Sequence, residues 1–169
     1  MTGHSADPDL RVAFREAVSS TWVICAADGG RPVGFTAISV VSVSVAPPLV
    51  SFNLSKSSSS RSAIEATGRV SLHLLASHQD DIARRFAGDR TSRFLGDWHW
   101  HEDGLPSLTE FSARLTADIA ATVDAGDSLL VTARVTNQQQ GQGDPLVHHQ
   151  GSYRTLNPTP TLVLQEESA

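Results

Sequence analysis

Short runs of β-branched and aromatic residues, separated by tight-turn sequences, recur along this chain of 169 residues and constrain its fold more than any other feature. The run Thr21–Ala27 ends at Asp28-Gly29-Gly30, and the runs Ser112–Val123 and Ser128–Thr136 are joined by Asp124-Ala125-Gly126-Asp127. Such turns are typical of antiparallel hairpins. A parallel α/β fold needs strands that alternate with long helices, which this sequence lacks. We therefore predict a mainly β protein, an antiparallel β-barrel with two or three short helices.

Further strands and three short helices complete this prediction. The additional strands are expected at Val33–Val45, Leu49–Leu54, Arg69–Leu75, Leu146–His149 and Ser152–Leu156. The helices are expected at Pro8–Ser19, Ser62–Thr67 and Gln79–Ala87. Each helix has a cap sequence at its start: Asp7 with Pro8 at the first helical position, Ser62 with Glu65, and Ser77 with Asp80. Gly68 and Gly88 are placed to end the second and third helices.

The composition places these elements in one domain and excludes several classes of function. The 13 Lys and Arg against 18 Asp and Glu give a net charge of −5, so the basic surface typical of nucleic-acid binding is missing. No apolar run approaches the ~20 residues that span a bilayer, and no signal-peptide pattern opens the chain. We expect a cytoplasmic protein with one domain at residues 8–156, and flexible or partner-docking termini at residues 1–7 and 157–169.

Three smaller features stand apart from the regular pattern. The Gln- and Gly-rich segment Asn137–Pro145 is predicted to be a mobile hairpin loop. The apolar run Leu162–Leu164 could add an edge strand or dock on a partner, and both alternatives stay open. Cys25, the single cysteine, cannot form an internal disulfide or a zinc–thiolate cluster. Because its surroundings in the sequence are apolar, we predict a buried and inert thiol.

The segment Ser55–Ser62, SKSSSSRS, combines six hydroxyls with two cations between a predicted strand and a predicted helix. Hydroxyl and backbone N–H donors at a helix start, with Lys56 and Arg61 beside them, suit a bound anion such as a phosphate. The alternative interpretation is a flexible serine-rich linker. Neither a Walker A sequence nor G-x-G-x-x-G is present, so those devices would not hold the phosphate.

The sequence gives weaker support for two other kinds of site, a metal site and a hydrolase triad. His99 and His101 would share one face of a strand and could ligate a metal together. No carboxylate or cysteine pattern completes such a site, so we favour packed or surface histidines and no metal. A hydrolase triad is also unsupported, because the chain lacks the G-x-S-x-G sequence of a nucleophile elbow.

Eight motifs follow one another along residues 10–156: Gly34-Phe35-Thr36-Ala37-Ile38-Ser39, Ser42-Val43-Ser44, Pro47-Pro48-Leu49-Val50, Ser59-Ser60, Arg85-Phe86-Ala87-Gly88, Asp124-Ala125-Gly126-Asp127, Pro145-Leu146-Val147 and His149-x-Gly151-x-Tyr153. In this order they resemble the short-chain flavin reductases, the reductase components of two-component flavin-dependent monooxygenases. The order of the motifs is much more specific than any one of them.

The resemblance implies a fold, an activity and partners. The fold would be an FMN-binding split β-barrel, usually a homodimer with FMN or FAD near the dimer interface. The activity would be that of an NAD(P)H:flavin oxidoreductase, in which hydride passes from NADH or NADPH to flavin N5. The reduced flavin would then serve a partner monooxygenase.

The resemblance also implies roles for individual residues. Those expected to contact the flavin are Thr36, Ala37 and Ser39 along the isoalloxazine ring, Asn53, Leu54 and Ser55 beside the ring and ribityl chain, and Ser59 and Ser60 at the phosphate. We add Lys56 and Arg61 to the phosphate site on physical grounds. The nicotinamide pocket would include Phe86, His149 and Tyr153. His149 would be the catalytic residue, orienting the nicotinamide carboxamide or stabilising the reduced flavin.

Three positions depart from the family's usual pattern. Ile38 stands where a small hydroxyl residue is common, Ser128 where a histidine is common, and Arg134 where an acidic residue is often found. The last two would lie near the nicotinamide, so they leave an alternative function open beside the reductase, a flavin-binding carrier, sensor or scaffold without efficient reductase activity. A ligand-binding β-barrel without a phosphate site is a third hypothesis.

Overall fold

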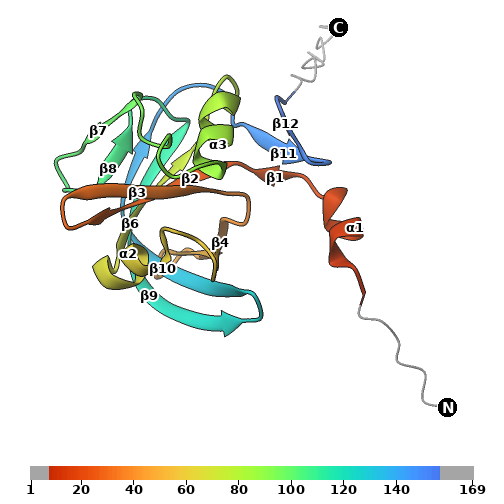
Figure 1. Cartoon of the computed structure of the whole chain (residues 1–169), viewed down its shortest axis with the longest axis horizontal. Helices are drawn as coiled ribbons and strands as arrows, with labels where there is room; N and C mark the ends of the chain where they lie inside the picture. The colour runs from red at the N-terminus through yellow and green to blue at the C-terminus, as the bar shows by residue number, and fades with distance from the viewer. Residues whose placement is uncertain (1–7, 157–169) are drawn as a thin grey trace, which may run out of the picture.

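The computed structural model describes residues 8–156, and one large antiparallel sheet dominates it (Figure 1). Its seven strands lie in the order β3-β2-β6-β9-β10-β5-β4. Their bounds are β2 (Trp22–Asp28), β3 (Arg31–Ala37), β4 (Val41–Ser44), β5 (Leu49–Ser55), β6 (Arg69–Leu74), β9 (Ala113–Ala125) and β10 (Ser128–Gln140). Because β3 and β4 are unpaired edges, the sheet is not closed and the barrel is split. The predicted mainly β, antiparallel split-barrel fold is confirmed.

The main hydrophobic core lies between strands that are distant in the sheet order. The rings of Phe35 on β3 and Phe52 on β5 have centroids 6.4 Å apart, although four other strands separate β3 from β5 in the sheet. Alternate residues of β5 face this core, so Phe52 and Leu54 are fully buried while Asn53 is exposed. The period-2 alternation of a strand thereby places one face of β5 inside and the other outside.

A second core lies on the opposite face of β2, under helix α3 (Asp80–Ala87). Val23 and Cys25 of β2 contact it, and α3 contributes Ile82 and Phe86. Since β2 is covered on both faces, its residues read as a continuous apolar run rather than an alternating one.

The remaining elements form two small sheets and two further helices. One sheet has the order β1-β11-β12, with bounds Ser19–Ser20, Val147–His149 and Ser152–Arg154. The other pairs β7 (Trp98–Trp100) with β8 (Pro106–Leu108). Helix α2 (Arg61–Thr67) packs against β2, and α1 (Leu10–Arg15) extends away from the body of the molecule (Figure 1). Within residues 8–156, no helix is long and apolar enough to cross a bilayer.

All three helices exist, but their predicted starts are wrong. Helix α1 begins two residues later than expected, because the Asp9 carboxylate accepts a hydrogen bond from the Arg11 backbone N–H at 3.0 Å and caps it. Asp7 lies outside the described residues. Helix α2 has Ser60 at its N-cap position rather than Ser62, and α3 has Gln79 rather than Ser77. The ends of α2 and α3 are correct: Gly68 is in the left-handed conformation that favours glycine, with φ of 64°, and Gly88 follows α3. Helix α1, expected to reach Ser19, ends at Arg15, because Ser19 pairs with His148 as part of β1.

Two strand predictions also need correction. The expected strand Val33–Val45 is divided into β3 and β4, because the residues between them turn away from the ladder. The expected mobile loop Asn137–Pro145 is strand as far as Gln140, where it pairs with Ala113 of β9. Backbone hydrogen bonds to β9 hold the glutamines in the strand regardless of their side chains. The run Leu162–Leu164 lies outside the described residues.

Candidate functional site

The ends of β3 and β5 meet at one point, where the predicted ring-binding residues Ser39 and Asn53 come together. The Asn53 backbone N–H donates a hydrogen bond of 2.9 Å to the Ser39 hydroxyl. Asn53 itself is exposed on the outer face of the sheet. Ile38, next to Ser39, is 43% exposed. This strand end is therefore open to a ligand.

The side chains of three other residues predicted to contact the flavin ring are buried or hydrogen-bonded within the protein. Ala37 and Leu54 are buried in the main core, so their side chains have no free surface. The Thr36 hydroxyl donates a hydrogen bond of 2.6 Å to the Ala83 carbonyl and ties β3 to α3. A ligand could reach these three residues through their backbone atoms, but the sequence could not tell backbone from side-chain contact.

The serine-rich segment is an ordered connection, folded by its own hydroxyl groups. The Ser55 and Ser57 hydroxyls are 2.9 Å apart, and the Ser58 hydroxyl accepts a hydrogen bond from the Ser60 backbone N–H. The Ser60 hydroxyl is buried and donates to the Gly34 carbonyl at 3.1 Å. Of the two hydroxyls expected at the phosphate, only that of Ser59 belongs to an exposed residue.

Gly34 of β3, which accepts the Ser60 hydrogen bond, is packed closely against β2 and α3. A Cβ at this position would lie 2.9 Å from the Ile24 carbonyl oxygen and 3.0 Å from the Cys25 sulfur. It would also lie 3.1 Å from the ring of Phe86. Real side chains do not reach such distances without a shift of the backbone, so the position needs glycine.

Arg93 is the cation that completes the serine site, and no local sequence pattern identified it. Its Nη1 donates 2.7 Å to the Gly34 carbonyl and 3.3 Å to the Ser59 hydroxyl. Its Nη2 donates 2.9 Å to the Gly88 carbonyl. These bonds hold the guanidinium beside Ser59, although 34 residues separate the two in the sequence.

Ser59 and Arg93 line a cavity of about 290 Å³ between β3, the serine-rich segment and the residues that follow α3. Three guanidinium groups face it, those of Arg31, Arg90 and Arg93, against one carboxylate, Asp28. Asp28 and Arg31 form an ion pair at 3.2 Å. The excess of positive charge, together with the Ser59 hydroxyl, is the donor set that a phosphate requires.

The two cations added from the sequence have other partners. Lys56 forms an ion pair of 2.7 Å with Asp124 at the tip of the β9–β10 hairpin. Arg61 forms an ion pair of 3.3 Å with Glu65, one turn further along α2. Neither residue lines the cavity beside Ser59. The positive charge beside Ser59 therefore comes from Arg31, Arg90 and Arg93, and not from Lys56 or Arg61.

Phe86, expected in the nicotinamide pocket, is a core residue with 1% of its surface exposed. Its ring packs edge-on against Phe94, with centroids 5.0 Å apart, and Phe94 packs in the same way against Trp98 at 5.2 Å. Phe94 lines the cavity beside Ser59. Phe86 thus supports the wall of the cavity from behind, and its side chain has no surface for a ligand.

The motif His149-x-Gly151-x-Tyr153 forms the hairpin of β11 and β12, but its two ring residues point to opposite faces. Tyr153 is paired across the hairpin with His148, and their rings lie 5.6 Å apart. His149 is paired with Ser152. The Arg84 guanidinium of α3 lies 5.2 Å from the centre of the Tyr153 ring. The expected pair was His149 with Tyr153, whereas the structure pairs His148 with Tyr153 and places His149 on the opposite face of the hairpin.

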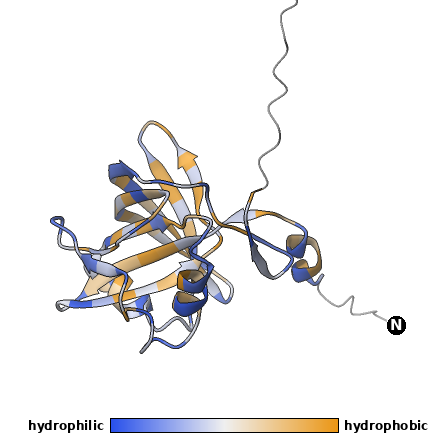
Figure 2. Cartoon of the chain, turned by 90° about the horizontal axis from the view of Figure 1, so that it is seen from above, coloured by the Kyte–Doolittle hydropathy of each residue, from blue (hydrophilic) through white to orange (hydrophobic). Residues whose placement is uncertain are grey.

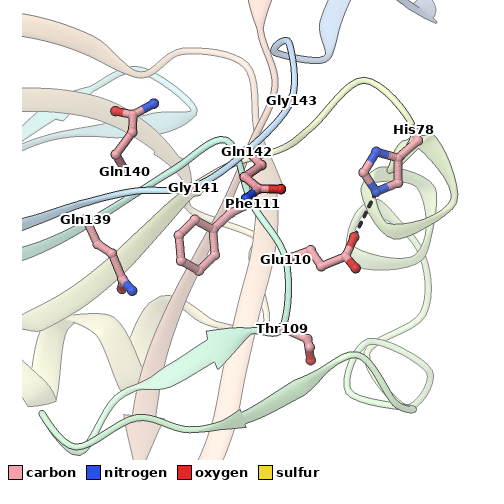
Figure 3. A pocket seen from close by; sticks show the side chains of 9 residues that line it. All are labelled: His78, Thr109, Glu110, Phe111, Gln139, Gln140, Gly141, Gln142 and Gly143. Carbon is pink, nitrogen blue, oxygen red and sulfur yellow. Dashed lines mark hydrogen bonds and ion pairs between the residues drawn. The ribbon is translucent and has the colours of Figure 1, made fainter.

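A second cavity, of about 600 Å³, lies elsewhere in the molecule (Figure 3). The side chains of His78 and Glu110 are hydrogen-bonded at 2.9 Å on one side of it, and Phe111 lies between them and the glutamines at the end of β10. None of the residues predicted to bind flavin or nicotinamide lines this cavity. It also has no arginine or lysine among its lining residues, so its chemistry does not match a phosphate.

The remaining predicted positions have plain structural roles. His101 lies 3.2 Å from the Asp103 carboxylate, while its partner in the metal hypothesis, His99, is exposed on β7. Cys25 is 1% exposed, and burial raises the pKa of its thiol, as an inert cysteine requires. Ser128 donates a hydrogen bond to the neighbouring Asp127, and Arg134 is exposed on β10.

The structure combines an antiparallel split barrel with an arginine-lined cavity beside Ser59, a combination that suits the class of β-barrel proteins that bind a phosphate-bearing ligand. The comparisons with known proteins agree, since the family described as "Flavin reductase like domain" matches residues 14–157. The chain belongs to this flavin reductase family.

Individual relatives are similar over nearly the whole chain. The NADH:FMN oxidoreductase of Rhodococcus erythropolis is 36% identical over 159 residues, which cover 90% of this chain and 82% of the relative. The HsaB reductase subunit of a flavin-dependent monooxygenase from Rhodococcus jostii is 30% identical, with 90% and 80% covered. Among solved structures, a flavin reductase domain protein from Arthrobacter superposes with a TM-score of 0.85 at 31% identity, over 91% of this chain and 98% of that one.

Proposed function

We propose that this protein is an NADH-dependent flavin reductase that supplies reduced flavin to a partner monooxygenase. Membership of the flavin reductase family supports the reaction, and the cavity beside Ser59 supports the flavin phosphate as its anchor. The single observation that carries the proposal is that Arg93, whose guanidinium is held by the Gly34 and Gly88 carbonyls, lines this cavity together with Ser59.

In such a reaction the residues of this chain bind the flavin and orient the nicotinamide. Bound FMN or FAD supplies the chemistry, because its N5 accepts a hydride directly from a nicotinamide. Ser59 and Arg93 hold the phosphate, and Ser39 with Asn53 marks the open strand end where the ring is expected. His149 orients the nicotinamide carboxamide from the β11–β12 hairpin. No general acid or base is needed for hydride transfer, so the chain needs no catalytic triad.

Two partners belong to the proposal. The first is a flavin-dependent monooxygenase, because the relative HsaB is the reductase subunit of such an enzyme. The second is another copy of the chain, which would form a homodimer near the flavin. We place this function in the cytoplasm, where reduced nicotinamide cofactors are available.

An anaerobic titration tests the activity. FMN is added to the purified protein, the flavin absorbance is recorded, and NADH or NADPH is then added in excess. Loss of the flavin absorbance at catalytic rates with NADH supports a reductase. Flavin that binds but bleaches slowly with both nucleotides would instead identify a carrier, sensor or scaffold. Absence of any flavin uptake would contradict both functions and leave a barrel for another ligand.

A further inference from the structure

The segment between α3 and β7, residues 88–97, supplies two of the three arginines that line the cavity beside Ser59, Arg90 and Arg93, and also Phe94. The segment contains neither helix nor strand. Phe94 and Leu95 are its only hydrophobic residues, whereas hydrophobic residues are concentrated in the strands of the large sheet (Figure 2). Burial of apolar side chains therefore gives this segment little support, and hydrogen bonds have to hold it in place.

Both ends of the segment are bonded to one residue, Arg85 of α3. At the first end, the Gly88 backbone N–H donates a hydrogen bond of 3.2 Å to the Arg85 carbonyl. At the other end, the Arg85 guanidinium donates 3.0 Å to the Leu95 carbonyl and 3.1 Å to the Asp97 carboxylate. The Arg85 side chain is only 20% exposed, so water competes little for these bonds. Arg85 thereby closes the segment into a loop.

The backbone conformation at the end of the segment needs such support. Gly96 has a φ of 81° and Asp97 a φ of 58°, so two successive residues lie in the left-handed region. Aspartate tolerates this region better than most residues do, but the conformation still costs free energy. Two bonds to Asp97 act against that cost, one from Arg85 to its carboxylate and one of 2.9 Å from the Thr109 N–H to its carbonyl.

The position of Arg93 depends on this loop. Its guanidinium donates to the carbonyl of Gly34 on β3 and to that of Gly88 at the start of the segment. Gly88 is also the residue whose N–H bonds to the Arg85 carbonyl. Two residues after Arg93, the Leu95 carbonyl accepts a bond from the Arg85 guanidinium. The backbone that carries Arg93 is therefore anchored to Arg85 on both sides.

We propose that Arg85 is a positioning residue for the flavin phosphate, because its bonds to Leu95 and Asp97 keep the loop closed with Arg93 at the cavity before flavin binds. The inference rests on the proposed function, in which the phosphate binds beside Ser59. Arg85 does not itself line the cavity, so it acts through Arg93. When the loop opens, the observed dissociation constant rises in inverse proportion to the fraction of molecules in which Arg93 is in place.

Fluorescence titration with FMN and with riboflavin, which has no phosphate, tests this role. Arg85→Met keeps the length of the side chain and removes both of its bonds. Arg69→Met is the matched control, because Arg69 likewise pairs with one carboxylate, that of Asp118, and donates to one backbone carbonyl, that of Asp103, both at 3.4 Å and outside the cavity.

We expect Arg85→Met to weaken FMN binding by roughly 5- to 20-fold, as the closed loop falls to between about a fifth and a twentieth of the molecules. Riboflavin binding should change by no more than about twofold, and Arg69→Met should leave both affinities unaltered. Unchanged FMN binding by Arg85→Met would overturn the proposal. Equal weakening for both flavins would also overturn it, since Arg85 would then only support the fold. Far-ultraviolet circular dichroism checks that each variant is folded.

A double variant shows whether Arg85 acts through Arg93. We expect Arg85→Met combined with Arg93→Ala to bind FMN as weakly as Arg93→Ala alone, within about twofold, because no guanidinium is left to position. Losses that multiply in the double variant would mean that the two residues act independently, and the positioning role would be wrong.

Substitutions of the exposed partner Asp97 provide a test that leaves α3 intact. Asp97→Asn keeps an oxygen acceptor for Arg85 and tolerates the left-handed backbone, so its FMN affinity should stay within about twofold of that of the unaltered protein. Asp97→Ala lacks both properties and should bind FMN at least about threefold more weakly. Equal affinities of the two variants would contradict the proposed hold on the loop.

The same titrations separate this inference from the proposed function. An unaltered protein that binds no FMN would refute the proposed function, and with it the task assigned to Arg85. FMN binding that is tighter than riboflavin binding in the unaltered protein, and stays so in Arg85→Met, would refute the inference alone.

Discussion

Arg93 is the residue on which the proposed phosphate site beside Ser59 depends most. Its guanidinium donates to two backbone carbonyls, those of Gly34 and Gly88, and to the Ser59 hydroxyl. A planar group held by several bonds presents its charge in a fixed direction, which is what recognition of a phosphate requires. Lys56 and Arg61, which are nearer in the sequence, have their charges paired with Asp124 and Glu65.

Replacement of Arg93 therefore separates phosphate binding from ring binding. We expect Arg93→Ala to weaken FMN binding by roughly 10- to 100-fold, the effect of losing charge-assisted hydrogen bonds. Binding of riboflavin, which has no phosphate, should change by no more than about twofold. Fluorescence titration with both flavins measures this, with Arg69→Ala as a control outside the cavity. Equal weakening for both flavins would mean that Arg93 only supports the fold.

The opposite directions of His148 and His149 permit a second test at this scale. We expect His149→Ala to lower kcat/KM for NADH by roughly tenfold, the effect of one lost orienting hydrogen bond. His148→Ala removes the ring that contacts Tyr153 and should leave this parameter near that of the unaltered protein. Steady-state oxidation of NADH with saturating FMN provides the measurement. If His148→Ala lowers kcat/KM for NADH and His149→Ala leaves it unchanged, the nicotinamide lies on the Tyr153 side of the hairpin.

The elements themselves were largely predictable, whereas their ends were not. Glycines marked the ends of α2 and α3 correctly, because Gly68 adopts a conformation that other residues avoid. The helix starts failed because several hydroxyl and carboxylate side chains near each start could act as a cap. Ser60, the N-cap residue of α2, instead donates its hydroxyl to Gly34, a partner that local sequence does not reveal.

The end of β10 depends on a close backbone contact that can be tested. Gly141 donates its N–H to the Ser112 carbonyl, and a Cβ there would lie 1.8 Å from the Phe111 carbonyl oxygen. We expect Gly141→Ala to lower the free energy of unfolding by about 1–3 kcal/mol, since the strand end must shift. Urea denaturation followed by circular dichroism measures the change. Gly88→Ala, where the nearest atom is 3.3 Å away, should cost less; an equal loss would contradict the steric explanation.

At the scale of the whole molecule, a buried histidine couples stability to pH. His73 is fully buried, its Nδ1 lies 3.3 Å from the Val23 carbonyl, and its Nε2 accepts a hydrogen bond from the Leu108 N–H. Burial, together with the charge of Arg114, lowers the pKa of His73 from 6.5 to about 3. Between these values the unfolded chain binds a proton that the folded chain does not, so stability falls as the pH falls below 6.5.

We expect the free energy of unfolding to fall by about 1–2 kcal/mol between pH 6.5 and pH 5, given a slope of at most ~1.4 kcal/mol per pH unit for one proton. Urea denaturation at several pH values measures it. His73→Gln should flatten this dependence, and His99→Gln, at an exposed position, should leave it in place. A steep dependence that persists in His73→Gln would assign it to other groups.

Sequence alone determined the class of fold, the two hairpins β2–β3 and β9–β10, and the position of the serine-rich segment between a strand and a helix. These depend on neighbours: alternation along a strand, turn residues between strands, and the order of motifs along the chain. Tertiary structure alone decided that Arg93 stands beside Ser59, that Phe86 is buried, and that His148 rather than His149 faces Tyr153. Contacts between distant segments depend on sheet register and on which of several possible hydrogen-bond or packing partners a side chain meets. Neither can be read from the local pattern of residues.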